Sequence, residues 1–217
     1  MSLKTFVLGL SAVVMLSGCA SNTTQPSQYS GFLGDYSQLR PAQSASGVPV
    51  MRWVSPDFKL ENYRSVLVIR PVFHPAPAPS DQVSQQTLDE ITAYLQQAMK
   101  LELAGRLRIV EQADSDTLVL RTAISAIDLS PEGLKVYEVI PIALVTAAAS
   151  AAAGTRDLDT DIYVELEAID GRTSQPMARV VRKGHGLQLE NDSTQLRLQD
   201  IKPVLDEWAK DARNFKP

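Results

Sequence analysis

The sequence predicts an α+β fold: a single mixed β-sheet with helices packed on it, preceded by a signal peptide and a flexible tether. Several segments alternate apolar and polar residues, as half-buried strands do. Two other segments, 88–99 and 198–212, repeat apolar residues at helical spacing. The predicted strands and helices follow one another in an order that suits a sheet covered by helices.

The first nineteen residues have the features of an export signal. Lys4 gives the start a positive charge, and residues 6–16 form an apolar run. That run is too short to cross a membrane, which takes about 20 residues. The following Leu16-Ser17-Gly18-Cys19 is similar to the lipobox at which bacterial lipoproteins are cleaved and acylated. We therefore expect residues 1–18 to be a signal peptide and Cys19 to carry a lipid anchor.

Cys19 is the only cysteine of the chain. Disulfide bonds and zinc–thiolate sites are therefore excluded from the mature protein. One acyl chain anchors a protein only marginally, and the resemblance to lipoproteins implies a triacylated cysteine. In the common sorting pattern an Asp at the next position favours the inner membrane, so Ala20 predicts the outer membrane. The alternative is a plain secretory signal with a coincidental cysteine.

A tether and an aromatic arm are expected next. Residues 19–29 are small and polar after the cysteine and cannot bury enough apolar surface to fold alone. Residues 30–62 carry Phe32, Tyr36 and Trp53, the largest apolar side chains outside the globular domain. We expect this arm to cover a face or an edge of the sheet. The alternative is that the three aromatic residues form a docking site for a partner near the membrane.

The run Ser-Gly-Phe-Leu-Gly-Asp-Tyr-Ser-Gln-Leu at 30–39, soon after a lipidated cysteine, resembles a family of bacterial lipoproteins. The family is catalogued as domain of unknown function 3313. The likeness extends over most of the mature chain, and the later β-α-β pattern is a weaker match. The resemblance implies an envelope lipoprotein, but it implies no activity, and it brings no catalytic residues.

The globular domain is expected to span 63–217. The β-branched segment 63–70 predicts a central strand, and the prolines of 71–79 end it and form a stiff connector. A helix capped by Ser80 or Ser84 then runs to Gly105. Two further strands are predicted, at 107–111 and 118–126.

The last part of the chain predicts a hairpin and a closing helix. Strand 162–169 has one apolar face, and Asp170-Gly171 predicts a turn into a partner strand at 177–189. The helix at 198–212 contains Pro203, so it should either start near Asp200 or kink there.

An uncharged apolar segment, 139–154, lies between these two halves. It is too short to span a membrane, and Pro141 interrupts it. We expect a core element or a tight internal hairpin. A self-association surface and a membrane-dipping segment are the alternatives.

The sequence predicts no catalytic residues, no metal site and no cofactor. His74 and His185 are isolated, without the cysteines or spaced carboxylates of a metal motif. Glu165 and Glu167 share a strand face and could form a carboxylate pair, although an exposed charged face is the commoner arrangement.

Two further classes of site are also disfavoured. The alternating aspartates within 157–161 resemble a calcium loop superficially, but the Gly and the closing Glu of such a loop are missing. The net charge of −4, with no dense basic run, gives no footprint for nucleic acid.

The sequence therefore predicts a non-enzymatic outer-membrane lipoprotein that faces the periplasm and acts as a binding or scaffolding module. Two alternatives of other classes remain: an oligomeric assembly or export component built through 139–154, and a hydrolase acting on the envelope. The expected partners are the membrane, through the lipid at Cys19, and either an envelope protein or a second copy of the chain.

Overall fold

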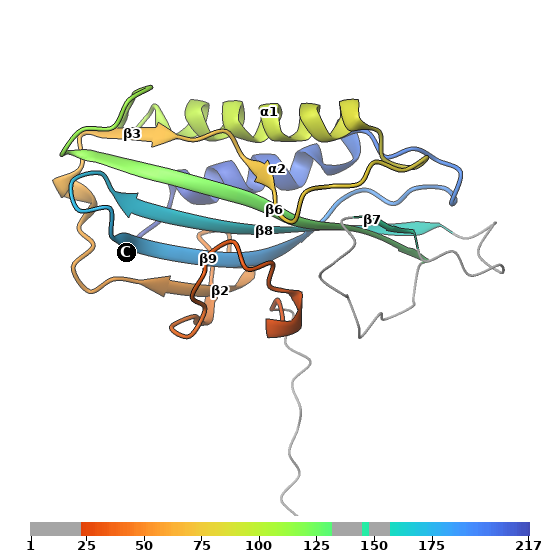
Figure 1. Ribbon diagram of the computed structural model, residues 1–217, viewed down its shortest axis with the longest axis horizontal. Helices are drawn as coiled ribbons and strands as arrows, with labels where there is room; N and C mark the ends of the chain where they lie inside the picture. The colour runs from red at the N-terminus through yellow and green to blue at the C-terminus, as the bar shows by residue number, and fades with distance from the viewer. Residues whose placement is uncertain (1–22, 132–144, 148–156) are drawn as a thin grey trace, which may run out of the picture.

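The computed structural model describes residues 23–131, 145–147 and 157–217, and it has the predicted α+β fold (Figure 1). Nine strands form one mixed sheet in the order β1-β2-β9-β8-β6-β3-β5, with β4 and β7 also paired to β6. Helices α1 (Gln85–Leu103) and α2 (Leu198–Arg213) lie together on one face. The strands are β1 (Arg40–Gln43), β2 (Pro49–Val54), β3 (Ser65–Val68), β4 (Val72–Phe73), β5 (Arg108–Ile109), β6 (Thr117–Pro131), β7 (Val145–Ala147), β8 (Leu158–Asp170) and β9 (Pro176–His185).

The predicted first helix is confirmed by α1. The Ser84 hydroxyl accepts a hydrogen bond from the Thr87 N–H at 3.1 Å, so Ser84, one of the two expected caps, starts the helix. The apolar stripe is buried against the sheet, and the helix ends two residues before Gly105. Val66 and Val68 of β3 are buried in the same core.

The closing helix α2 starts at Leu198 and keeps Pro203 inside it. The carboxylate of Asp200 accepts a hydrogen bond from the Arg197 N–H at 2.7 Å and fixes this start. Proline there costs the helix one internal hydrogen bond. The Pro203 side chain is exposed, so the freed carbonyl belongs to a water-facing part of the helix.

Three long antiparallel strands, β6, β8 and β9, form the centre of the sheet. The strands β6 and β8 extend beyond the predicted 118–126 and 162–169. The turn predicted at Asp170-Gly171 joins β8 to β9, and the Asp170 carboxylate accepts hydrogen bonds from the N–H groups of Arg172 and Thr173. Asp159 and Asp161 lie within β8, which is not the loop that a calcium site of that spacing needs.

Strands β1 and β2 were not predicted from the sequence. Strand β2 pairs with β9, with Met51 opposite Val181 and Trp53 opposite Arg179, and β1 pairs with β2 at the sheet edge. The boundary expected at residue 63 therefore falls inside one continuous sheet. Residues 40–54 are part of that sheet, and residues 29–39 lie across its other face, in front of β9 in Figure 1.

Two expectations concern parts of the chain that the structure describes little or not at all. Of the apolar segment 139–154, only β7 is described, and it pairs in parallel with β6 through Ile127 and Val145. Cys19 and the signal segment lie outside the described residues. Within the described ranges, no helix is long and apolar enough to cross a membrane.

Candidate functional site

The sheet face that carries the helices has a hollow, and two small residues meet beside it. Ala168 of β8 is paired with Ala178 of β9, and both point to the helix side of the sheet. Their row continues to Leu120 of β6 and Val54 of β2. Both alanines are buried, and a gap between the sheet and the helices lies beside them.

The gap is a cavity of about 870 Å³ between the sheet and the two helices. Its volume lies within the roughly 300–1,000 Å³ of typical ligand pockets. Helix α1 contributes Leu95 and Met99 to the wall, and α2 contributes Trp208. The more exposed part of the lining, which we call the mouth, includes residues 43–45, Arg52, Arg106 and residues 213–217.

A second row of residues runs along the cavity. Arg52 of β2, Val180 of β9, Leu166 of β8 and Thr122 of β6 are successive cross-strand partners. Val180 and Leu166 are in the middle of the sheet on its helix side, where side chains are normally covered, yet both are only half-buried. Their surface faces the cavity.

Three buried polar atoms in the cavity wall have no hydrogen-bond partner. They are the Thr122 hydroxyl, the Trp208 indole nitrogen and the Arg182 Nε. These side chains are at most 6% exposed. A buried polar group without a partner costs about 1–3 kcal/mol, and such groups are rare in folded proteins. Two of the three atoms are donors only, and all three are covered by neighbouring side chains.

The charged side chains of the lining are mostly cationic. Arg52, Arg106, Arg182, Arg213 and Lys216 belong to it, and Asp211 is its one acidic side chain.

Four of these side chains are held by the protein. Asp211 binds Arg182 at 2.5 Å and accepts a hydrogen bond from the Ser46 N–H at 2.7 Å. Arg106 donates hydrogen bonds to the backbone carbonyls of Arg213 and Phe215. The Arg213 side chain pairs with Glu102 at 3.2 Å.

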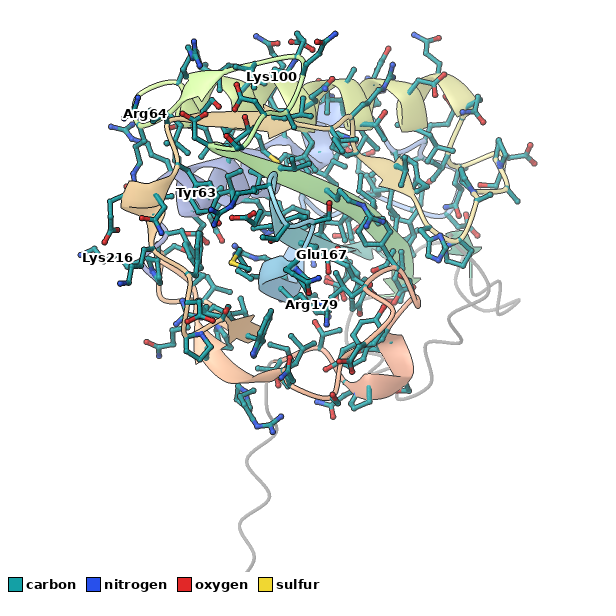
Figure 2. The ribbon with its side chains drawn as sticks, turned by 60° about the vertical axis from the view of Figure 1, so that its left-hand side comes forward. Tyr63, Arg64, Lys100, Glu167, Arg179 and Lys216 are labelled. Carbon is teal, nitrogen blue, oxygen red and sulfur yellow. The ribbon has the colours of Figure 1, made fainter. Side chains whose placement is uncertain are left out.

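Two cationic side chains at the mouth are free of carboxylate partners. Within the described part of the chain, neither Arg52 nor Lys216 forms a salt bridge or a side-chain hydrogen bond. The Arg52 guanidinium lies 5.6 Å from the centre of the Phe215 ring. Lys216 is exposed at the outer edge of the molecule (Figure 2).

The opposite face of the sheet is occupied by the aromatic arm. The Tyr36 hydroxyl donates a hydrogen bond of 2.6 Å to the Glu165 carboxylate, and the Ser30 N–H donates another of 2.6 Å to the second oxygen. Leu33 and Leu39 are buried against Val181 of β9. Burial, together with the hydrogen bond to Glu165, raises the pKa of the Tyr36 hydroxyl above its usual range.

The expectation that Glu165 and Glu167 face solvent is wrong. Glu165 is 0% exposed beneath the arm, and Glu167 is paired with Arg179 at 2.8 Å and with Arg121 at 3.3 Å. Figure 2 shows Glu167 and Arg179 next to each other on this face. Because each carboxylate is engaged by cations or by the arm, the two do not form a free catalytic pair.

The three aromatic residues considered as a docking site are all half-buried on this face. Phe32 lies under the Arg121 guanidinium at 4.9 Å, Tyr36 stacks on Tyr29 at 4.6 Å, and Trp53 lies beside Arg179. The structure thus brings them together on the sheet, with part of each ring surface still accessible.

Neither histidine belongs to a metal cluster in the described ranges. His74 lies near the Phe32 ring, and His185 binds the Asp161 carboxylate at 2.6 Å. Burial alone would raise the pKa of Asp161, but the hydrogen bonds and charges of His185 and Lys183 outweigh it and lower that pKa.

The cavity was not predicted from the sequence, although a signal for it exists. Asp170-Gly171 predicts the turn, and a turn fixes which residues of two strands face each other. The structure has Ala168 opposite Ala178 as a result. Two small residues that face each other on the apolar side of a hairpin contribute little side-chain volume to the core at that point.

The family profile described as "Protein of unknown function (DUF3313)" matches residues 28–212. The "Uncharacterized lipoprotein YdcL" of Escherichia coli strain K12 is 45% identical over 209 residues, which cover 96% of this chain and 94% of that protein. The protein of the same description in Escherichia coli O157:H7 matches equally well. Among solved structures, a PelC dodecamer from Paraburkholderia phytofirmans is 9% identical, with a TM-score of 0.39 over 77% of this chain and 98% of that one. At this TM-score the structural similarity gives no functional conclusion.

Proposed function

Because this chain belongs to the DUF3313 family, which is described only as a protein of unknown function, we propose its function from the cavity. It is a lipid-anchored, non-enzymatic binding module of the outer membrane that faces the periplasm and holds a small, largely apolar ligand between the sheet and the helices. The observation that carries this proposal is the cavity of about 870 Å³ between the sheet and the two helices.

The lipid anchor is supported by the sequence and by the relatives. The Leu16-Ser17-Gly18-Cys19 motif is in place, and the Escherichia coli relatives are described as lipoproteins. Ala20 supports the outer membrane. Changing Cys19 to Ser should move the protein from the outer-membrane fraction to the soluble periplasm. Recovery of the wild-type chain in the soluble fraction with an unmodified Cys19 would contradict the anchor.

A binding role is supported by the composition of the cavity wall. Ligand pockets are mostly apolar, with a few placed polar groups that fix orientation. The wall here is apolar along both helices and the sheet, and Thr122, Trp208 and Arg182 supply the polar atoms. The one acidic side chain in the wall, Asp211, is already bound by Arg182 and Ser46, which supports a role without general acid–base chemistry.

The test is photolabelling of the purified full chain, in a non-ionic detergent, with a long-chain alcohol that carries a diazirine. Peptide mapping should place the label on cavity-wall residues such as Met99 and Val180. Replacing both Ala168 and Ala178 by Leu should abolish labelling there, whereas Ala93→Leu on the exposed side of α1 should not. Labelling confined to the outer surface, or unchanged in the double variant, would refute the proposal.

A further inference from the structure

We infer that the ligand is a single-chain amphiphile with an anionic head, whose chain lies in the cavity and whose head lies at the mouth beside Arg52 and Lys216. This inference rests on the proposed binding role of the cavity and names the ligand class. Its basis is the contrast between an apolar interior and a mouth where two cationic side chains have no anionic partner.

The two side chains differ from the other cations of the lining. Arg182, Arg106 and Arg213 are each held by carboxylates or carbonyls of the protein. Arg52 and Lys216 have no such partner within the described residues. A guanidinium and an ammonium at one opening attract a carboxylate or a phosphate, and the guanidinium can bind either in a bidentate manner.

The interior fits the chain of such a molecule. From Arg52 the row runs through Val180 and Leu166 to Thr122, across four strands of the sheet. At about 4.8 Å between neighbouring strands this is roughly 14 Å of wall. The side chains between the two ends, Val180 and Leu166, are apolar and half-buried, so their surface is available to an acyl chain.

The charges disfavour the other head groups. A cationic head would meet five cationic side chains and one carboxylate that is already paired. A neutral head would leave Arg52 and Lys216 without a counter-charge.

Two sources offer this chemistry: a free fatty acid, with its carboxylate, and a lysophospholipid, with its phosphate. A protein held at a membrane by a lipid anchor meets both. The shared feature is one acyl chain joined to one anionic group.

The experiment compares two photoreactive probes of the same chain length, a C16 fatty acid and the C16 alcohol, on the full chain in non-ionic detergent. We expect the acid to label the cavity wall about five- to tenfold more efficiently than the alcohol, as two exposed charge contacts allow. Replacing both Arg52 and Lys216 by Gln should lower labelling by the acid to that of the alcohol and leave labelling by the alcohol unchanged.

A matched control removes two other positive charges, with Arg172→Gln and Lys210→Gln, both exposed and outside the cavity lining. It should change neither probe. If acid and alcohol label the wall equally and the mouth variant has no effect, the anionic head is wrong while the binding role stands. If neither probe labels the wall, the anionic head and the binding role are both wrong.

Competition with unlabelled molecules distinguishes a fatty acid from a lysophospholipid as the ligand. Palmitate or 1-palmitoyl lysophosphatidylglycerol should displace the acid probe, and the stronger competitor identifies carboxylate or phosphate as the preferred head. Displacement by neither molecule would overturn the inference.

Discussion

Ala168 of β8 and Ala178 of β9 face each other across the central hairpin on the helix side of the sheet. Next to them the half-buried Leu166 and Val180 face the cavity between the sheet and the helices. On the reverse side of the same strands, Glu167 and Arg179 form an ion pair, and the arm packs beside it. The central hairpin thus separates a filled face from a hollow one.

The first prediction concerns the space over the half-buried Val180. Val180→Ile should leave the free energy of unfolding unchanged or raise it by about 1 kcal/mol, because the added carbon enters the cavity. Ala123→Leu, on the tightly packed face under the arm, should lower it by about 1–3 kcal/mol. Urea unfolding of both variants measures the difference. Equal destabilisation would mean that the cavity has no room for the larger side chain.

The second prediction concerns the contact between the arm and the sheet. Tyr36→Phe should lower the free energy of unfolding by about 1.5–3 kcal/mol, because it removes a hydrogen bond to the buried Glu165 carboxylate. Hydrogen exchange of residues 30–39 should become faster. Tyr29→Phe is the control, since its hydroxyl makes no hydrogen bond in the described ranges. If both variants behave alike, the Tyr36–Glu165 bond does not hold the arm.

The third prediction concerns acid stability. The pKa of Asp161 is lowered in the folded protein from its ordinary 3.8, so its contribution to stability is present above that pH and is lost as the pH falls through the folded value. Asp161→Asn should therefore lower the free energy of unfolding by about 1 kcal/mol at pH 7 and have little effect near pH 2. Urea unfolding at pH 2, 4 and 7 measures this. A deficit that persists at pH 2 would show that the ion pairs with Lys183 and His185 are not its cause.

The fourth prediction concerns the contact between α2 and β9. A Cβ at Gly184 would clash with the Val204 Cγ1 and lie 3.0 Å from the Trp208 ring, so Gly184→Ala should cost about 1–3 kcal/mol of stability. Val204→Ala in the same chain should recover part of that loss. Gly105→Ala is the control, because its nearest neighbour is 3.7 Å away. An equal effect of the two alanines would contradict the close packing at Gly184.

The elements that could be predicted from the sequence carry their own local signals. The Ser84 cap and the apolar spacing of 88–99 define α1, and Asp170-Gly171 defines the central hairpin. Strands β1 and β2 could not be found in the same way, since Pro41 and Pro49 weaken a short local pattern and their pairing depends on distant β9. In the same way, the alternation of Glu165 and Glu167 along the chain does not reveal that a segment about 130 residues earlier covers them.

The candidate site likewise has a part that could be predicted from the sequence and a part that could not. The aromatic residues Phe32, Tyr36 and Trp53 stand out by size, and the structure gathers them on one face. The cavity, in contrast, is a space between residues of β8, β9 and the two helices, and no single residue indicates it. Only the register of the hairpin relates Ala168 to Ala178, and only the fold brings Trp208 and Arg52 to the same space.

The central claim, that the cavity binds an acyl chain, can be tested with the two tryptophans of the protein. Trp208 lines the cavity, and Trp53 lies on the opposite face of the sheet. Dibromostearate quenches a tryptophan that it touches, so it should quench the Trp53→Phe chain, in which Trp208 remains, and leave the fluorescence of the Trp208→Phe chain nearly unchanged. Equal quenching of the two variants, or quenching of Trp53 alone, would show that the acyl chain does not enter the cavity.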